Sequence, residues 1–374
     1  MTRGTLEHTH ATTTKLPSDT KSSLLCFVAA STTTTIWYLL PKLTAYSSIN
    51  SLAAMKLPTA ISALNSPPLV AGAGTAILLG LPMLEAATGA GGVSLLALKA
   101  LNVTAFGINV AAVSAPGRMD GQEQERALKQ QDSSADDSKP NAVMAMRERT
   151  LVAPSGWAFA IWGPIYLGEL LICGSQFATP ALDSMMSGFT GPFVAANLLQ
   201  SLWCAAFRPS YASHKWYKYI SAGLLGGTAF SLSKAVLITS AAGTGGYALI
   251  PITMHFGWTT AATLVNFNGS LAMSNKEDPP ASDSTIIAVG HSSAVLAIVL
   301  GVGITTLANL PVYGLTISWA LAACASNPKL ATNKKNDEPT ASIFQRGAKV
   351  QKFLLTSGSI LCAGSSLATW FLGI

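Results

Sequence analysis

Residues 284–328 read STIIAVGHSSAVLAIVLGVGITTLANLPVYGLTISWALAACASNP, and this stretch contains no Asp, Glu, Lys or Arg. A helix needs about 20 apolar residues to cross the roughly 30 Å of hydrocarbon in a bilayer, so this stretch has room for two spans. A soluble α/β fold with buried strands would need charged surface between its apolar runs. The sequence therefore predicts membrane-spanning helices.

The whole chain shares this character, since 49% of its 374 residues are hydrophobic and 11% are charged, against about 25% charged in soluble domains. The five cysteines are scattered without a Cys-x-x-Cys pair, which indicates neither a disulfide framework nor a zinc site. We expect an all-α fold, a polytopic transmembrane bundle of about nine helices. The predicted spans are 68–84, 93–115, 153–178, 189–207, 217–241, 247–274, 284–308, 309–327 and 353–373.

Residues 1–66 differ from the spans, because no acidic residue occurs between Asp19 and Glu85 and Ser, Thr and Ala dominate. Such composition is typical of transit peptides, and an apolar run at 24–40 resembles a signal segment. An address to a plastid or mitochondrial membrane is one interpretation. A disordered tail is the other. An extra N-terminal span is expected within 67–92.

The charges of the loops alternate along the chain. Loops 85–92, 179–188 and 242–246 and the link into Pro311 contain no Lys or Arg. The intervening loops hold the basic residues, which are Lys42, Lys56, Arg147, Arg149, Arg208, Lys215, Lys218, Lys276, Lys329, Lys334, Lys335, Arg346, Lys349 and Lys352. The positive-inside rule assigns these loops to the cytosol, matrix or stroma and the C-terminus to the opposite side. The long charged connection 116–150 is predicted to be solvated.

Three segments carry a resemblance to a known family. Residues 154–166 read PSGWAFAIWGPIY, residues 196–207 read ANLLQSLWCAAF, and residues 258–266 read WTTAATLVN. In this order they resemble the tryptophan-containing motifs of the TspO/MBR family, the tryptophan-rich sensory or translocator proteins. The chain departs from the family in spacing and at Ala196, Gln200 and Val265.

The resemblance covers about residues 93–274 and implies a TspO-like five-helix core that binds hydrophobic ligands such as tetrapyrroles and sterols, often as a dimer. Residues 275–374 then supply three additional transmembrane helices. The candidate ligand-binding residues are Trp157, Phe159, Trp162, Tyr166, Gln200, Trp203, Phe207, His255, Trp258 and Asn266. An ordinary alternative for the aromatic residues is an interfacial belt or helix packing.

Ionisable residues inside spans are costly in hydrocarbon and mark functional candidates. Lys99, Glu169 and Lys234 occupy similar depths in their predicted helices, about 24–26 Å from the basic face. We expect Glu169 to pair with Lys234 or Lys99, whereas snorkelling of each lysine to the far headgroups is the alternative. Asn102 and Asn109, seven residues apart, are expected to bond across the bundle or to contact a ligand.

The leading function is binding or transport of a hydrophobic ligand. An ion- or proton-coupled transporter and an intramembrane enzyme are the alternatives. No catalytic residue is assigned, because the sequence has no nucleophile elbow, metal-ligand cluster or nucleotide loop. No cofactor is fixed, although the resemblance allows a bound porphyrin or heme. The expected partners are membrane lipids, the hydrophobic ligand and a second copy of the chain. Gly223-x-x-x-Gly227 allows close helix approach, which fits packing inside the chain as well as dimerisation. Nucleic acid is not expected, because the basic residues lie in short loops.

Overall fold

The computed structural model describes residues 64–89, 91–114, 150–207, 209–212, 214–243, 246–273, 281–327 and 339–372. The predicted targeting segment and the 116–150 loop lie almost wholly outside the described residues. Every regular element in the described ranges is helical, which confirms the all-α prediction. The nine α-helices described are α4 (Pro67–Gly89), α5 (Leu95–Ser114), α8 (Trp162–Ser175), α9 (Asp183–Trp203), α10 (Ile220–Ala241), α11 (Gly246–Ala272), α12 (Asp283–Leu307), α13 (Pro311–Ala325) and α14 (Pro339–Leu372).

Seven helical segments are long and apolar enough to cross a membrane, and large apolar side chains such as Leu79 and Leu237 face outward from them. Helices α9 and α13 are the exceptions among the predicted spans. Helix α13 is shorter at 15 residues, and α9 carries Asn197 and Gln200 on its buried face. Outward apolar and inward polar side chains are the pattern expected of a bundle solvated by lipid.

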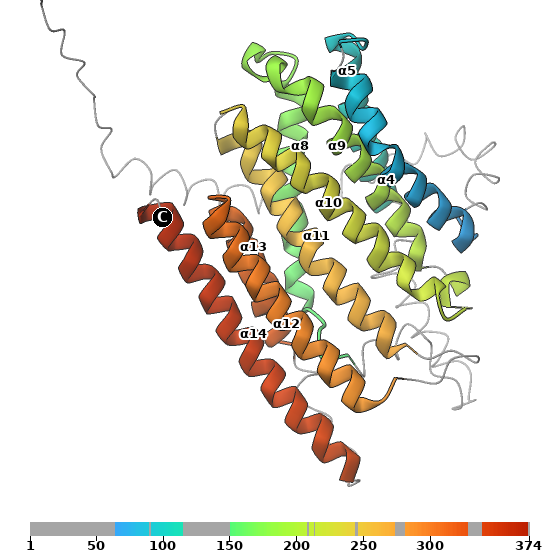
Figure 1. Cartoon of the computed structure of the whole chain (residues 1–374), viewed down its shortest axis with the longest axis vertical. Coiled ribbons are helices and arrows are strands. Elements are labelled where there is room, and N and C mark those ends of the chain that lie inside the picture. Colours follow the sequence, from blue (N-terminus) through green and yellow to red (C-terminus); the bar gives the residue numbers. More distant parts are fainter. Residues whose placement is uncertain are drawn as a thin grey trace, which may run out of the picture. The chain divides into compact units, whose positions relative to one another are not determined.

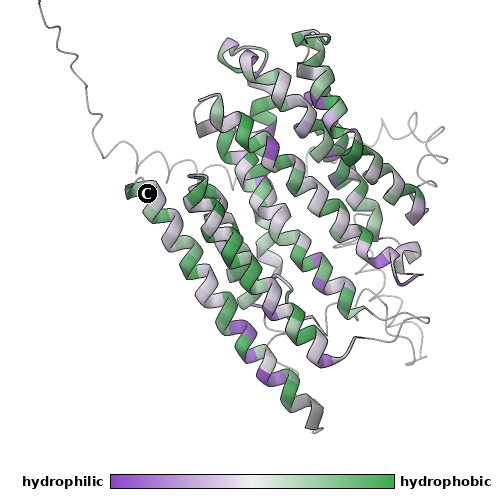
Figure 2. Cartoon of the chain, in the orientation of Figure 1, coloured by the Kyte–Doolittle hydropathy of each residue, from purple (hydrophilic) through white to green (hydrophobic). Residues whose placement is uncertain are grey.

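Helix α14 differs from its prediction. The expected span began at residue 353, but α14 begins at Pro339 and runs for 34 residues. Its early turns carry Arg346, Lys349 and Lys352, and Figure 2 shows hydrophilic colour there. Apolar runs mark only the part of a helix inside hydrocarbon, whereas the backbone hydrogen bonds continue equally well outside it. Helix α14 therefore begins 14 residues before the predicted span, as 353 minus 339 gives.

Helices α9 and α11 hold the bundle together (Figure 1). Helix α9 packs against α4, α5 and α10, and α11 packs against α8, α10, α12 and α13. Helix α14 packs against α12 and α13. The five helices of the expected core, α5 and α8 to α11, thus form a connected group to which α4 and the three C-terminal helices are added.

Two glycines permit close helix crossings. A Cβ at Gly168 of α8 would overlap the ring of Pro251 in α11, so these two helices approach each other at this point. At Gly227 of α10 a Cβ would press on Leu78 of α4 and Leu199 of α9. At Gly223, the other glycine of the predicted pair, an added Cβ would meet no atom of the neighbouring described helices within 4 Å. Gly227 therefore serves packing inside the chain, and the homodimer stays a prediction.

Contacts between loops confirm the alternation predicted from their charges. Lys218 Nζ, just before α10, donates to the carbonyl of Met273, just after α11, at 2.9 Å. At the other end of the bundle, Leu249 near the start of α11 shares a pocket with Asn309 between α12 and α13 and with Trp370 near the end of α14. Alternate loops therefore lie at opposite ends of the bundle.

Candidate functional site

The segment that opens the third predicted span begins with the 3₁₀ turn η1 (Gly156–Ile161), after which α8 starts at Trp162. This turn directs its aromatic residues to different neighbours. Trp157 Nε1 donates to Ser326 Oγ at 3.2 Å, and its ring meets Trp319 of α13 edge-on at 4.7 Å. The structure therefore places Trp157 against α13, apart from the other predicted ligand residues.

A chain of hydrogen bonds crosses the centre of the bundle and joins α8, α9 and α11. His255 Nδ1 lies 2.6 Å from Glu169 Oε1, and His255 Nε2 lies 2.5 Å from Gln200 Oε1. Gln200 Nε2 in turn donates to Tyr166 Oη at 2.9 Å. Glu169, His255 and Gln200 are 0% exposed. We call these four residues the polar chain.

The arrangement of the polar chain fixes where its protons are needed. Gln200 donates its amide to Tyr166, so its carbonyl oxygen faces His255 Nε2. The carboxylate oxygen of Glu169 faces the other ring nitrogen. Both contacts are satisfied by an imidazolium that donates to both side chains, or by a neutral imidazole that accepts from a protonated Glu169 and donates to Gln200. Either arrangement leaves the buried chain without net charge.

Aromatic rings surround the polar chain on the α8 and α11 side. Trp162 stacks on Tyr166 with ring centroids 5.1 Å apart, and it meets Trp258 edge-on at 6.1 Å and His255 at 5.6 Å. Phe159 meets Trp258 edge-on at 5.9 Å. We call Phe159, Trp162, Tyr166 and Trp258 the aromatic cluster. Its members come from two of the three motifs that carried the family resemblance.

Of the remaining predicted ligand residues, two make contacts of their own between helices, and the side chain of the third is not described by the structure. Trp203 Nε1 donates to Asn266 Oδ1 at 3.4 Å, which joins the ends of α9 and α11. Asn266 Nδ2 donates to the carbonyl of Ala262 at 2.8 Å. Both side chains thus hold helix contacts. Phe207 ends the turn η3 (Cys204–Phe207), and its side chain lies outside what the structure describes.

The predicted pairing of Glu169 with a lysine is wrong. Lys99 Nζ pairs with Asp183 at 2.7 Å, Lys234 Nζ pairs with Glu85 at 2.9 Å, and Glu169 pairs with His255. Each lysine stem is long enough to carry its ammonium group towards an acid near the end of a neighbouring helix. The signal that sequence reasoning missed was the position of Glu85 and Asp183 at the lysine-free end of the bundle.

The cross-bundle bonds expected for the two asparagines of α5 are confirmed. Asn102 Nδ2 donates to Gln176 Oε1 at 3.1 Å, and Asn109 Nδ2 donates to Asn197 Oδ1 at 2.9 Å. Their seven-residue spacing places both on the helix face that meets α8 and α9. These amides hold α5 on the core.

The described residues contain no group of three or more His, Cys, Asp or Glu side chains that could hold a metal ion. At the polar chain, both ring nitrogens of His255 already face other side chains.

Comparison with known proteins supports the resemblance seen in the motifs. The family described as TSPO-like protein matches residues 136–344. This match is more than half of the chain; it includes α8 to α13 and extends beyond the motif region into the C-terminal helices. No curated protein and no solved structure matches the chain. With its apolar spanning helices and this match, the chain is a multi-pass membrane protein that belongs to the TSPO-like protein family.

Proposed function

We propose that the protein binds a hydrophobic, planar ligand, such as a tetrapyrrole or a sterol, between the aromatic cluster and the polar chain. The proposal rests on the second carboxylate oxygen of Glu169, Oε2. This oxygen is buried and has no hydrogen-bond partner among the described residues, while Oε1 of the same carboxylate is held by His255. An unmet acceptor in a bundle interior is costly. A ligand N–H or O–H group would satisfy it.

The aromatic cluster supports a flat ligand body. Trp162 and Tyr166 are stacked on each other with an interplanar angle of 13°, so an outer face of this stack would form one flat wall. Trp258 stands nearly perpendicular to Trp162, at 85°, and forms a second wall. Planar rings prefer offset stacking on one wall and edge contacts with the other. Such a corner fits a tetrapyrrole plane or the flat face of a sterol.

Phe159 provides the route into this corner. Its side chain is 37% exposed and contacts the edge of Trp258, whereas Trp258 is 4% exposed. Exposed side chains change rotamer on the picosecond to nanosecond scale. Rotation of Phe159 would expose the Trp258 indole to a ligand that arrives through the bilayer.

The test is an equilibrium titration of protoporphyrin into the full chain in detergent, followed by the absorption band of the porphyrin. Trp258→Leu should weaken the affinity about tenfold, because an aromatic wall contributes about 1.4 kcal/mol. Trp216→Leu is the matched control, since Trp216 is 65% exposed outside the cluster. Equal affinities for the two variants would reject the site. A competition titration with a sterol measures whether the sterol displaces the bound porphyrin.

A second candidate, proton-coupled transport, is favoured by the buried contact between Glu169 and His255 alone. Carboxylate and histidine pairs inside bundles are recurrent parts of proton relays. Vesicles that contain the protein and a pH-sensitive dye would report proton movement when porphyrin is added. A proton flux that Glu169→Gln abolishes supports transport, and ligand binding without any flux leaves a binding module.

A further inference from the structure

The early turns of α14 carry three exposed basic side chains, Arg346, Lys349 and Lys352, which we call the basic strip. No acid of the described residues pairs with any of them. The other lysines that the structure describes have partners, which are Asp183 for Lys99, Glu85 for Lys234, the Met273 carbonyl for Lys218 and the Trp216 ring for Lys215. The family match ends at residue 344. The basic strip is therefore a feature of this chain outside the matched region.

The turns that carry the basic strip are held against α12 by their opposite face. A Cβ at Gly347 would overlap the side chain of Ile287, so the two helices lie close together at this level. Gln351 Nε2 donates to the carbonyl of Gly290 at 3.1 Å, and its Oε1 lies 2.6 Å from His291 Nδ1. These contacts fix the early turns of α14 and leave the basic strip on the outer side.

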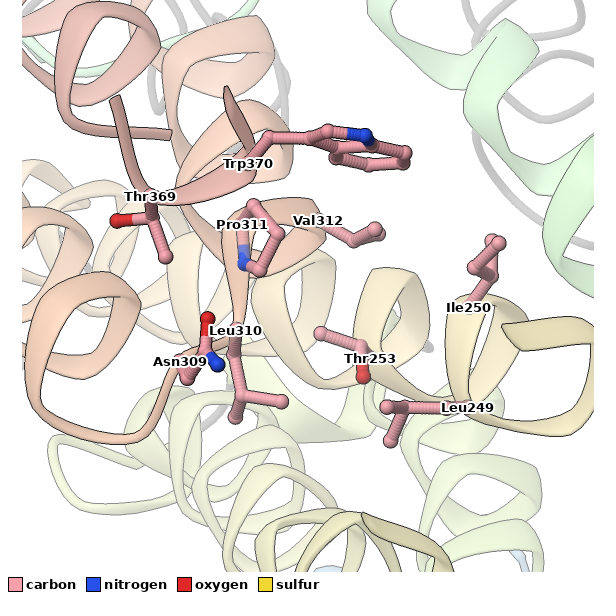
Figure 3. Close-up of a pocket in the computed structure, with 9 residues that line it drawn as sticks. All are labelled: Leu249, Ile250, Thr253, Asn309, Leu310, Pro311, Val312, Thr369 and Trp370. Carbon is pink, nitrogen blue, oxygen red and sulfur yellow. The ribbon is translucent and has the colours of Figure 1, made fainter. Parts of the chain in front are cut away.

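The length of α14 places the basic strip at a membrane surface. At the other end of this helix, Trp370 lines a pocket together with Asn309 (Figure 3), and tryptophan is enriched at the headgroup level. Lys352 lies 18 residues earlier, as 370 minus 352 gives, which is about 27 Å along the axis. Since the hydrocarbon is roughly 30 Å thick and each headgroup layer about 5–7 Å, Lys352 and Lys349 lie in the opposite headgroup layer. Arg346 lies at the outer edge of that layer.

Apolar side chains lie among the basic ones on the same exposed face. Val350 is 49% exposed and Phe353 is 70% exposed. A face that meets only water would leave this apolar area solvated, whereas acyl chains cover it at the hydrocarbon boundary. Cations with apolar neighbours at this depth match a lipid that offers an anionic headgroup above and acyl chains below.

The charge of the basic strip selects among headgroups. Its three residues follow one another at intervals of three, so they span about 9 Å along the helix axis. A phosphatidylcholine headgroup has no net charge, because its choline cation balances the phosphate. A phosphatidylglycerol headgroup has a net negative charge, and its phosphate oxygens accept hydrogen bonds from ammonium and guanidinium groups. We infer that the basic strip binds the headgroups of anionic phospholipids in the leaflet at the basic end of the bundle.

The experiment uses the full chain with Phe353→Trp, which places an indole next to the basic strip. Acyl chains that carry bromine quench an indole that they contact. The emission of this indole is the difference between Phe353→Trp and the parent chain in phosphatidylcholine vesicles. Brominated phosphatidylglycerol should quench it at mole fractions at least about fivefold lower than brominated phosphatidylcholine requires, because each basic residue near an anionic surface contributes about a factor of five.

Neutralising the basic strip should remove this preference. With Arg346→Gln, Lys349→Gln and Lys352→Gln together, the two brominated lipids should give the same quenching curve. The charge-retaining set Arg346→Lys, Lys349→Arg and Lys352→Arg should keep the preference of the parent. Lys215→Gln is the matched control, since Lys215 is an exposed basic residue in the loop before α10, and it should change nothing at the reporter. Circular dichroism and protoporphyrin affinity should be the same in all these variants, because the substituted side chains are exposed outside the aromatic cluster.

Three results would overturn the inference. The first is equal quenching by the two lipids in the Phe353→Trp chain, and the second is a preference that persists when the basic strip is neutralised. The third is a preference that inorganic phosphate abolishes and chloride at the same ionic strength does not, because the site would then bind free phosphate rather than lipid.

Discussion

Replacing His255 by leucine tests the polar chain most severely, because one substitution removes the centre of the network. His255 is 0% exposed and contacts Glu169 on one side and Gln200 on the other. Leucine fills much of the same space but offers no hydrogen bond. The variant leaves a buried carboxyl group and a buried amide oxygen unpaired, while Tyr166 keeps its bond from Gln200.

The expected loss of unfolding free energy is about 3 kcal/mol. Removing one partner of a buried ion pair costs about 3–5 kcal/mol in soluble proteins, and the lower end applies because the carboxyl group can take up a proton. Hydrogen bonds alone average about 0.6 kcal/mol between membrane helices. A loss near 3 kcal/mol therefore separates a charged pair from ordinary interhelical hydrogen bonds.

Unfolding by SDS in mixed micelles, followed by circular dichroism, measures this loss. His291→Leu is the matched control, since His291 Nδ1 lies 2.6 Å from Gln351 Oε1 and no carboxylate of the described residues pairs with it. It should cost about 1 kcal/mol. Glu169→Met combined with His255→Leu should recover about 2 kcal/mol relative to His255→Leu alone, because the unpaired carboxyl group is gone.

The reasoning is refuted if His255→Leu costs no more than His291→Leu. It is refuted equally if the double variant is as unstable as the sum of its single variants, because the two side chains would then not be coupled.

Three further predictions concern other parts of the chain. Gly168→Ala should lower the free energy of unfolding by about 2 kcal/mol in the same SDS assay, because the added methyl group overlaps Pro251 and pushes α8 from α11. Gly163→Ala is the control and should leave this free energy unchanged, because a Cβ there would meet no described atom within 4 Å. Lys234→Met should cost less than about 1 kcal/mol, since the side chains of its pair with Glu85 are 34% and 26% exposed; a larger loss would show a desolvated pair. Residues 1–66 fused to a fluorescent protein should direct it to plastids or mitochondria under the microscope, and a diffuse cytosolic signal would favour the disordered-tail interpretation.

The spans were predictable because hydrocarbon thickness selects apolar runs of a fixed length, whatever the helices pack against. The ends of the helices were not predictable from the apolar runs, as α14 shows, because a helix continues outside the bilayer through charged residues such as Arg346. The inward faces of Asn102 and Asn109 were also predictable, since their spacing follows from helix geometry alone.

The partners of the ionisable groups required the structure. Depth along each helix placed Glu169, His255 and both lysines at comparable levels, but depth says nothing about distances between helices within the membrane plane. Lys99 and Lys234 reach acids on neighbouring helices. The sequence did not predict the orientation of Trp157 either, because η1 has three residues per turn rather than the 3.6 of an α-helix.

The affinity of protoporphyrin for Glu169→Gln, compared with the parent chain in the same detergent, tests the central claim most directly. Glutamine keeps the shape of the side chain but replaces the charged acceptor that Oε2 offers to a ligand. A charge-assisted hydrogen bond is worth about 1.5–3 kcal/mol, so the dissociation constant should rise at least about tenfold. An unchanged dissociation constant in a folded variant would contradict the account.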